Sequence, residues 1–517
     1  MHTLRFVGFT AVLLAGALPA QLSGTYFINA TLPLTPLSFP SFADATAALA
    51  AQGVSGPVDF LIFDDGGPFD EASPFATNNG TYGTNDAVLV MTSWTGASPT
   101  NRITFRAAPG ERPVLDATGR AMGVFWGGAD YVTLEGLEIA NASFDGISLY
   151  AESQHGVAND PIIDSCRIHD CNGTAITIYG NSSQPANTLV QNCTMWRCQL
   201  TGGGAFSTTG RFGYIATRRT NGTRIVHNTF YVDTLTDNSS YCVLGARPSS
   251  VSEVPYAEVS NNVFVKLAGP MAPLFRFQSV AGSSFPTPAV CDSNCFLDGS
   301  GGSFAIYGNP LVTAATLTDW QIGATLDLNS LAADPLLRDP ANADFHLTAS
   351  SPCIGGSTVA AGVAVDFDGQ ARTSPADIGA DEFSAADFTS VGAGCPGTGG
   401  IAPELLLYGW PFLGNPDFAV GLEQMPGNTL AVVFAAIGTS AVPIPIGGGC
   451  EVLIDPGTAL GIAALPAGPA GTGSVVLPLP SNATLVGFNI AYQGVVLDAG
   501  AALGLTTTNA IDIVLDF

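Results

Sequence analysis

Short runs of apolar residues alternate with polar ones and recur along the middle of the chain. Clear copies lie at 131–139, 161–168, 188–195, 224–230, 257–264 and 289–296, and their last residues are 27 to 35 positions apart. A second short apolar run follows most copies, and Gly, Asn and Ser fill the intervals. Runs of this length predict strands. Their regular recurrence predicts a solenoid of parallel coils, in which each coil stacks on the next to build one continuous core.

Equivalent positions of successive coils should form ladders along the solenoid axis. Two places before the end of each run stand Leu137, Cys166, Cys193, Asn228, Asn262 and Asn294. Because coils stack at the strand spacing of about 4.8 Å, side-chain amides at one position can bond to the coil above and the coil below. We therefore predict a buried asparagine ladder near a turn.

The repeats, together with the phrase "GGADYVTLEGLEI" (127–139), resemble the right-handed parallel β-helix family with its pectate-lyase-like fold. The resemblance covers roughly residues 22–385 and implies an all-β solenoid with capped ends. A Ser-initiated, alanine-rich stretch at 41–53 predicts a helical N-terminal cap, followed by a strand at 58–63. The segment 339–383 is similar to the closing segment of many secreted bacterial β-helix proteins, and we expect it at the other end.

Composition divides the chain into three parts. Residues 1–20 have the pattern of a secretory signal peptide, with Arg5, an apolar stretch and small residues up to Ala20. The β-helix with its caps is expected over 21–385, and a small all-β, sandwich-like module over 386–517. That module resembles C-terminal domains of exported planctomycete-type proteins through "GCPGTGG" and "LGLTTTNAIDIVL". Its only two cysteines, Cys395 and Cys450, are expected to pair.

The charge of the chain excludes nucleic acids as partners, and its hydropathy argues against an integral membrane protein. The net charge is −26, only 11% of residues are charged, and Lys266 is the only lysine. Without a basic stripe, a nucleic-acid backbone is excluded as a partner. No segment after the leader is apolar enough to span a membrane, so an integral membrane protein is not expected. We expect a secreted or cell-surface bacterial protein.

The stretch "DSCRIHDC" (164–171) tests whether the cysteines bind metal. "CTMWRC" (193–198) repeats its C-x₄-C spacing one coil later, so a Cys₄ zinc site is one hypothesis. However, Cys166 and Cys193 belong to the inward ladder, whereas Cys171 and Cys198 lie past the strand. We prefer stacked cysteines, with cross-links between neighbouring coils where the Cα separation permits them.

The residue that follows the last residue of each apolar run should point outward. These outward-facing positions suggest a ligand-binding strip. His169, Trp196 and Tyr231 should stack on consecutive coils, Asp170 and Arg197 should pair, and Glu138 should lie opposite Arg167. An exposed aromatic strip flanked by charges can bind sugar rings, and these three aromatic side chains are the predicted carbohydrate-binding residues. The alternative is that these ladders only stabilise the sheet.

The sequence supports catalytic and metal-binding residues less strongly than it supports the aromatic strip. A polysaccharide lyase needs a base and a group that neutralises a uronate carboxylate; His169 or Lys266 could be the base, and Arg167 or Arg197 the neutraliser. A glycoside hydrolase needs paired carboxylates, for which Asp164 and Asp170 are candidates, although no third carboxylate aligns beside them. Asp366, Asp368, Asp377 and Asp381 could bind Ca²⁺, with Asp366 and Asp368 as the main candidates, but we favour turn and cap chemistry for "DFDG".

The sequence therefore predicts a secreted or cell-surface protein that binds extracellular polysaccharide and, if it is an enzyme, degrades it as a lyase or glycoside hydrolase. The alternative is a non-catalytic adhesive or structural envelope protein. A deep groove over the aromatic strip favours the first, and a flat, covered face favours the second. The C-terminal module contains no His, Lys or Arg, which favours envelope attachment over catalysis.

Overall fold

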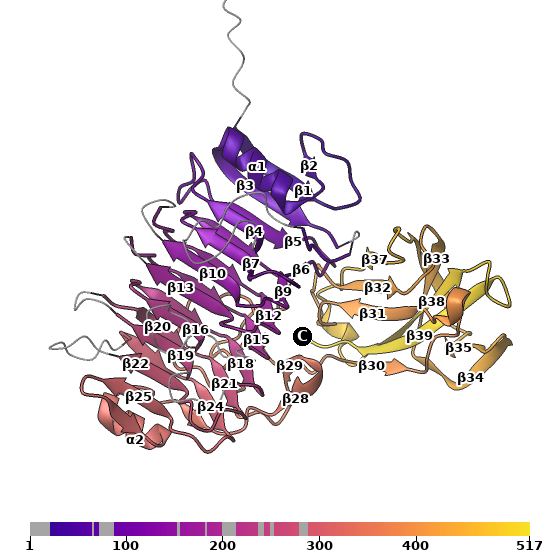
Figure 1. Ribbon diagram of the computed structural model, residues 1–517. Coiled ribbons are helices and arrows are strands. Elements are labelled where there is room, and N and C mark those ends of the chain that lie inside the picture. The colour runs from indigo at the N-terminus through magenta and orange to yellow at the C-terminus, as the bar shows by residue number, and fades with distance from the viewer. Residues whose placement is uncertain are drawn as a thin grey trace, which may run out of the picture.

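A computed structural model describes residues 21–64, 67–71, 87–151, 156–180, 183–198, 213–235, 242–248, 253–278 and 288–517. The predicted signal peptide lies outside these residues. The described chain forms a right-handed parallel β-helix followed by a smaller antiparallel module (Figure 1). The all-β fold class is confirmed.

The β-helix consists of three sheets, and each central coil contributes a strand to each sheet. The first sheet contains β1 (Leu22–Ile28), β2 (Ser38–Phe39), β3 (Val54–Ile62), β5 (Ile103–Ala107), β8 (Val132–Glu135), β11 (Ile162–Asp164), β14 (Leu189–Gln191), β17 (Thr223–Val226), β20 (Tyr256–Ser260) and β23 (Val290–Asp292). The second sheet contains β6 (Val114–Asp116), β9 (Glu138–Ala140), β12 (Arg167–His169), β15 (Thr194–Trp196), β18 (Thr229–Val232), β21 (Val263–Lys266), β24 (Cys295–Asp298) and β27 (Leu331–Ala332). The third sheet contains β4 (Ala87–Thr92), β7 (Met122–Gly127), β10 (Asp145–Ala151), β13 (Ile176–Gly180), β16 (Gly213–Arg218), β19 (Cys242–Arg247), β22 (Phe275–Gln278), β25 (Ala305–Gly308) and β26 (Val312–Ala314).

The predicted register is confirmed in the second sheet. Consecutive strands pair Ile139, Ile168, Met195, Phe230, Phe264 and Phe296 in parallel. All six side chains are buried in the core of the solenoid. The sequence repeat therefore marks structurally equivalent positions, because parallel strands in register place the same repeat position in the same layer.

The asparagine ladder is also confirmed. Asn228 Nδ2 donates to Asn262 Oδ1 at 3.0 Å, and Asn262 Nδ2 donates to Asn294 Oδ1 at 3.1 Å. The ladder continues one coil further, where Asn294 Nδ2 donates to Asp327 Oδ1. All of these side chains are fully buried, so the bonds satisfy groups that would otherwise be costly to remove from water.

A helix covers each end of the solenoid (Figure 1). Helix α1 (Phe42–Gln52) begins at Ser41, whose side chain accepts from Asp44 N, and ends at Gly53, as the sequence predicted. At the opposite end, α2 (Leu317–Ala324) buries Trp320, whose Nε1 donates to Asp327. The sequence analysis did not predict α2 and expected residues 339–383 at that end.

That expectation was wrong: residues 333–385, which we call the strap, run back along the side of the solenoid. The strap crosses the turn between the first and second sheets, where Asn192 Nδ2 donates to Val365 O and Asn261 Nδ2 donates to Val359 O. It begins with β28 (Leu337–Asp339) and β29 (Asp344–Leu347), which pair antiparallel. Asn192 and Asn261 have left-handed backbone angles and are buried, so the strap supplies the carbonyl groups to which their side chains donate.

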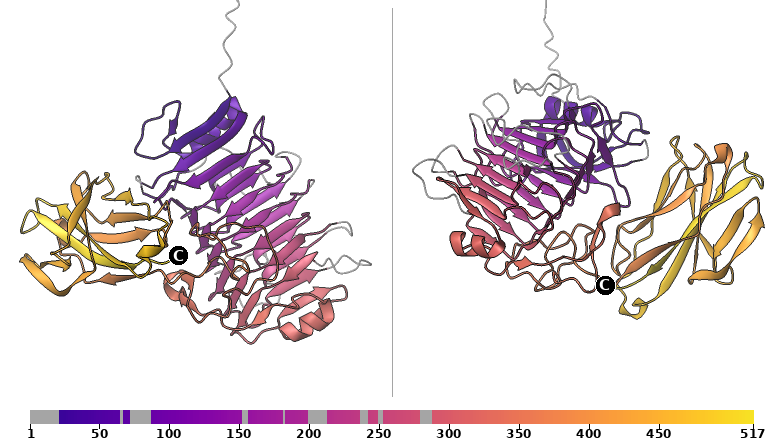
Figure 2. Two further views of the ribbon diagram at one scale, coloured as in Figure 1. Left: turned by 180° about the vertical axis from the view of Figure 1, so that it is seen from behind. Right: turned by 60° about the horizontal axis from the view of Figure 1, so that its bottom comes forward.

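The C-terminal module consists of two main antiparallel sheets that share a core, and it lies beside the solenoid (Figure 2). The larger sheet contains β30 (Asp387–Val391), β33 (Leu430–Ala436), β36 (Leu460–Pro466), β38 (Asn489–Leu497) and β39 (Leu505–Val514). The smaller sheet contains β31 (Glu404–Tyr408), β32 (Ala419–Glu423) and β37 (Gly473–Val476). A separate hairpin is formed by β34 (Thr439–Gly447) and β35 (Cys450–Ile454). The predicted Cys395–Cys450 disulfide is present. The module is close enough to the solenoid that a Cβ at Gly110 would lie 2.5 Å from Ala419 Cβ.

Candidate functional site between the solenoid, the strap and the module

A pocket of about 350 Å³ opens where the solenoid, the strap and the C-terminal module meet. The solenoid contributes Arg167, His169 and Trp196 to its lining, the strap contributes β29 and Asp368, and the module contributes Trp410. A second hollow of about 370 Å³ shares Arg112 and Glu138 with this pocket. We call the two hollows together the interdomain cleft.

His169 lies between two carboxylates on the solenoid side of the cleft. Its Nδ1 is 2.6 Å from Asp170 Oδ2, and its Nε2 is 3.1 Å from Glu138 Oε1. Arg197 holds Asp170 through both carboxylate oxygens, at 2.8 and 2.7 Å. Burial alone would raise the pKa of Asp170, but the hydrogen bonds from Arg197 and His169 lower it below its ordinary value. Because both ring nitrogens of His169 face carboxylates, neither has a lone pair directed at a ligand in the pocket.

The predicted aromatic strip is stacked but not exposed. The rings of His169 and Trp196 stack with centroids 4.3 Å apart. Phe345 of the strap lies 5.2 Å from Trp196 and 5.8 Å from Tyr231, and Trp196 is only 5% exposed. Tyr231 is not among the pocket-lining residues. The prediction of an exposed three-ring strip was therefore wrong, and the sugar-binding role of these residues stays a prediction.

Arg167 has a different environment from the other charged residues of the second sheet. Its register partner is Glu138, as predicted. Yet its guanidinium makes no hydrogen bond or ion pair with any residue that the structure describes, and lies only over the ring of Phe367 at 5.7 Å. Burial and the nearby charge of Arg112 lower the pKa of Arg167 to about 10, although the charges of Asp368 and Glu138, which make no ion pair with it, act in the opposite direction. The half-buried cation therefore faces the pocket without a partner.

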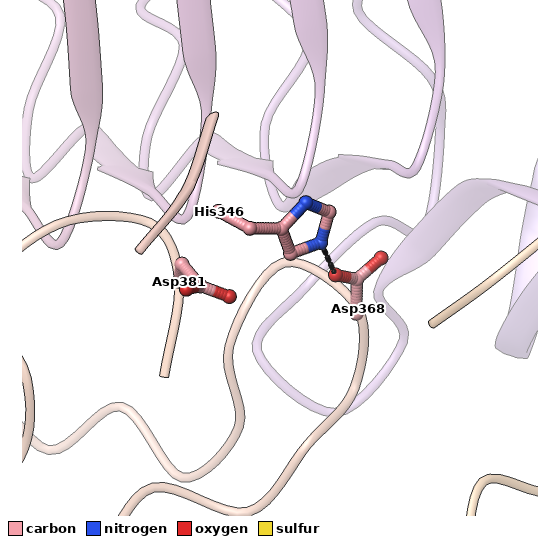
Figure 3. A group of neighbouring side chains, drawn as sticks. All are labelled: His346, Asp368 and Asp381. Atoms are coloured by element: carbon pink, nitrogen blue, oxygen red, sulfur yellow. Dashed lines mark hydrogen bonds and ion pairs between the residues drawn. The ribbon is translucent and has the colours of Figure 1, made fainter. Parts of the chain in front are cut away.

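On the strap side, His346 repeats the arrangement seen at His169. Its Nδ1 is 2.5 Å from Asp344 Oδ1, its Nε2 is 2.8 Å from Asp368 Oδ2, and its ring stacks on Trp410 at 3.7 Å. Burial lowers the pKa of His346, but the charge of Asp368 and the hydrogen bond to Asp344 outweigh burial and raise that pKa to about 10. Asp381 lies beside this group (Figure 3).

The remaining predicted candidates lie away from the pocket or are already bonded. Lys266 is fully buried in β21 and bonds to Asp298 and Ser300. Asp366 accepts backbone N–H groups from Asp368, Gln370 and Glu382. This is the turn chemistry that the sequence analysis weighed against calcium, and Gly369 supplies the positive φ of 86°.

The cysteine stack is confirmed as part of the core. Cys166, Cys171, Cys193 and Cys198 are fully buried free thiols, so the structure holds no cross-link between these coils. Burial raises the pKa of the Cys193 and Cys198 thiols well above the ordinary value. Among the described residues, the cysteines form no group of metal-ligating atoms, and the zinc hypothesis is not supported.

Sequence reasoning missed His346, Asp344 and Trp410. His346 is one of only five histidines and follows Asp344 at the two-residue spacing that places both side chains on one face of a strand. That spacing could have flagged the pair. Nothing in the sequence could have shown that Trp410, from the next domain, stacks on the ring.

Comparisons with known proteins found one matching family model and solved structures of low similarity. A family model described as a right-handed beta helix region matches residues 116–266, whereas no curated protein sequence matches the chain. The crystal structure of pectate lyase Pel9A aligns with 12% identity over 70% of this chain and 97% of its own, with a TM-score of 0.33. The enzymatically active domain of bacteriophage CBA120 tailspike protein 2 aligns with 10% identity over 90% of this chain and 62% of its own, with a TM-score of 0.16. No described helix is long and apolar enough to cross a membrane. The likeness of the C-terminal module to planctomycete domains stays a prediction.

Proposed function

We propose that this protein acts outside the cell and binds an acidic polysaccharide in the interdomain cleft, with Arg167 contacting a carboxylate or sulfate group of the sugar. The observation that carries the proposal is the half-buried guanidinium of Arg167, which has no partner among the described residues. A buried charge is costly to leave unpaired, so this position is explained if an anionic ligand completes it.

The chemistry of the cleft fits an acidic sugar better than a neutral one. The planar guanidinium can bind a carboxylate or sulfate through two parallel hydrogen bonds. Arg112, whose Nη2 is 3.6 Å from Glu138, is 44% exposed and lies in the same pocket. The chain as a whole carries a charge of −26, so general electrostatic attraction cannot account for anion binding, and a local site is required.

Aromatic rings give the cleft apolar walls for a sugar ring. Trp196, Phe367 and Trp410 line the pocket beside the two arginines. Pockets that combine apolar walls with a few converging polar groups are typical of small-ligand and sugar sites. Because the cleft continues into the second hollow, more than one sugar unit could be accommodated.

We propose binding rather than turnover as the primary activity. Both nitrogens of His169 and of His346 face carboxylates, and Lys266 bonds to Asp298 away from the pocket. A lyase needs a base with an available lone pair within hydrogen-bond reach of the proton it removes. Neither predicted base meets this requirement in the structure.

The C-terminal module, proposed over residues 386–517, completes the cleft instead of serving only as an attachment. Leu407, Gly409 and Trp410 line the pocket, and Arg338 of the strap pairs with Asp387 at 2.6 Å. Envelope attachment remains compatible with this role because the hairpin of β34 and β35 lies outside the cleft lining.

The experiment compares polysaccharide binding by the purified protein and two charge-matched variants. Arg167→Gln removes the unpaired cation, whereas Arg106→Gln removes an arginine that Asp59 already holds on the first sheet. Gel retardation and calorimetry on acidic and neutral polymers should show acidic binding that Arg167→Gln weakens about 10- to 100-fold, the range for losing a charge-assisted hydrogen bond. Arg106→Gln should stay within about twofold of the wild type, because Arg106 lies outside the cleft lining. Equal weakening in both variants, or a preference for neutral polymers, would contradict the proposal.

A non-catalytic adhesive or structural role is the second candidate. It is favoured by the cover that Phe345 forms over Trp196 and Tyr231, since a covered strip stabilises the sheet but binds nothing. Absence of retardation on every polymer would select this role. New reducing ends or unsaturated products would instead make the protein an enzyme.

A further inference from the structure

Three metal-ligating side chains converge at the wall of the cleft from separate parts of the strap. His346 comes from β29, while Asp368 and Asp381 come from the two loops that follow it (Figure 3). One potential ligand atom from each lies within 4.8 Å of the others. Among the described residues, no other group of three or more such side chains meets this condition.

The imidazole is held in the orientation of a metal ligand. Histidines that bind metals usually donate their other ring N–H to a carboxylate, which fixes the tautomer and aims the free nitrogen at the metal. Here Asp344 Oδ1 lies 2.5 Å from Nδ1, so Nε2 is the nitrogen directed at Asp368 and Asp381. This contact is independent of the two carboxylates that would share the ion.

The two carboxylates keep oxygen atoms available. Asp381 accepts from Leu347 N through Oδ2, and Asp368 contacts His346 through Oδ2. The Oδ1 atom of each carboxylate makes no hydrogen bond to a residue that the structure describes. Asp381 as a residue is 4% exposed, and Figure 3 shows its carboxylate extending toward Asp368. Carboxylate oxygens without a hydrogen-bond donor can serve as cation ligands.

We propose that His346 Nε2, Asp368 and Asp381 form a binding site for one divalent transition-metal ion of the zinc or manganese class. One imidazole with two carboxylates suits these ions, whereas Ca²⁺ prefers oxygen ligands alone. The site includes Asp368 and Asp381, two of the four aspartates considered for calcium, but not Asp366, whose oxygens accept three backbone N–H groups. Binding requires the proton between Nε2 and Asp368 to leave and the ligand atoms to close around the ion.

The ion would lie where it could also contact a ligand in the cleft. His346 and Asp368 line the pocket, whereas Asp381 lies behind them and is not part of the lining. Three protein ligands leave at least one coordination position, as in sites that exchange water for substrate. The proposal does not depend on the proposed polysaccharide, because metal binding can be measured without a sugar.

The test uses the full mature chain without a polyhistidine tag, stripped with EDTA and then dialysed against Zn²⁺ or Mn²⁺. Metal analysis after equilibrium dialysis should give one ion per chain. Asp381→Asn should weaken binding by at least 10- to 100-fold, since it removes a ligand charge while asparagine still accepts from Leu347 N. Asp366→Asn is the matched control, because Asp366 is equally buried in the same strap and should bind the ion within a few-fold of the wild type.

Thermal melting in EDTA checks that each variant is folded. If Asp381→Asn does not fold, Asp344→Asn replaces it; loss of this supporting carboxylate should weaken binding about 10- to 100-fold. No ion bound by the wild type, or equal losses in Asp366→Asn and Asp381→Asn, would overturn the site. Arg167→Gln should bind the ion normally, which separates failure of this site from failure of the polysaccharide proposal.

Discussion

Two histidines line the same cleft and have similar neighbours. His169 on the solenoid stacks on Trp196 and lies between Asp170 and Glu138. His346 on the strap stacks on Trp410 and lies between Asp344 and Asp368. A similar local arrangement is therefore built once from stacked coils and once from strand β29 and a loop of the strap.

The two sites differ in how their carboxylates are neutralised. At His169, Arg197 binds Asp170 through two hydrogen bonds and Arg112 lies 3.6 Å from Glu138. At His346, Arg338 lies 3.2 Å from Asp344, but no described arginine bonds to Asp368, and Asp381 adds a third carboxylate. Burial raises the pKa of Asp381 to about 7 against the lowering charge of His346, and the charge of Asp368 adds to the rise. A site with balanced charge needs no further ion, whereas a site with excess buried carboxylate does. The comparison indicates that the first is structural support and the second is a place for a cation.

The largest expected effect comes from removing each imidazole. His346→Leu should cost about 3–5 kcal/mol of unfolding free energy, because Arg338 still pairs with Asp344 but Asp368 loses the side chain that bonds to it beside the buried Asp381. His169→Leu should cost about 1–2 kcal/mol, because arginines remain beside both of its carboxylates. Urea denaturation of both variants in EDTA measures the difference. Equal losses would mean that the two sites are electrostatically alike.

A third histidine, His227, is buried, and no described carboxylate bonds to it. It shows how burial changes the pKa of an imidazole that has no carboxylate partner. Asn261 Nδ2 lies 3.0 Å from its Nε2, and burial, helped by the charge of Arg372, lowers its pKa to about 3. Below its unfolded pKa of about 6.5, the unfolded chain takes up a proton that the folded chain refuses, so stability falls as pH falls from 6.5 toward 3. Between pH 7 and 5 the wild type should lose about 2 kcal/mol more than His227→Gln. If the wild type and His227→Gln lost the same unfolding free energy between pH 7 and 5, this account of the site would be refuted.

Removing Arg197 should make the solenoid site resemble the strap site. Arg197→Gln leaves Asp170 without its bidentate partner, but the arginine is 40% exposed, so the cost should be only about 0.5–1 kcal/mol. Denaturation at low and high salt measures it, and the difference from the wild type should shrink at high salt. A loss above about 2 kcal/mol would show that solvent does not screen this pair.

The smallest effect is expected at Asp381. In EDTA, Asp381→Asn should change the unfolding free energy by at most about 0.5 kcal/mol, because lost attraction to His346 offsets relieved repulsion from Asp368. Thermal melting then compares stability with and without Zn²⁺ or Mn²⁺. The ion should raise the melting temperature of the wild type and not that of the variant. A variant that the ion stabilises as much as the wild type would contradict the assignment.

The solenoid was predictable because its repeat is visible in short segments of the sequence. The six paired core residues, the asparagine ladder and helix α1 all follow from spacing, capping and turn chemistry, which act over a few residues. The Asp170–Arg197 pair was found in the same way, because neighbouring coils turn a sequence offset into a contact.

The strap and the cleft were not predictable, because long-range packing positions them. Phe345 covers Trp196 from about 150 residues further along the chain, and no periodicity links the two. Trp410 reaches His346 only because the module docks on the strap. Arg167 could be named as a candidate from sequence, but its lack of a partner depends on how Phe367 and the module surround it.

The most direct test of the central claim pairs a change in the protein with a change in the ligand. Calorimetry would measure the affinity of a uronic-acid oligosaccharide and its carboxyl-reduced, neutral form for the wild type and for Arg167→Gln. If Arg167 contacts the acid group, reduction should weaken binding to the wild type about 10- to 100-fold and barely affect binding to the variant, giving a coupling energy of about 1.5–3 kcal/mol. Equal effects of reduction on both proteins would contradict the assignment of this cleft to acidic sugars.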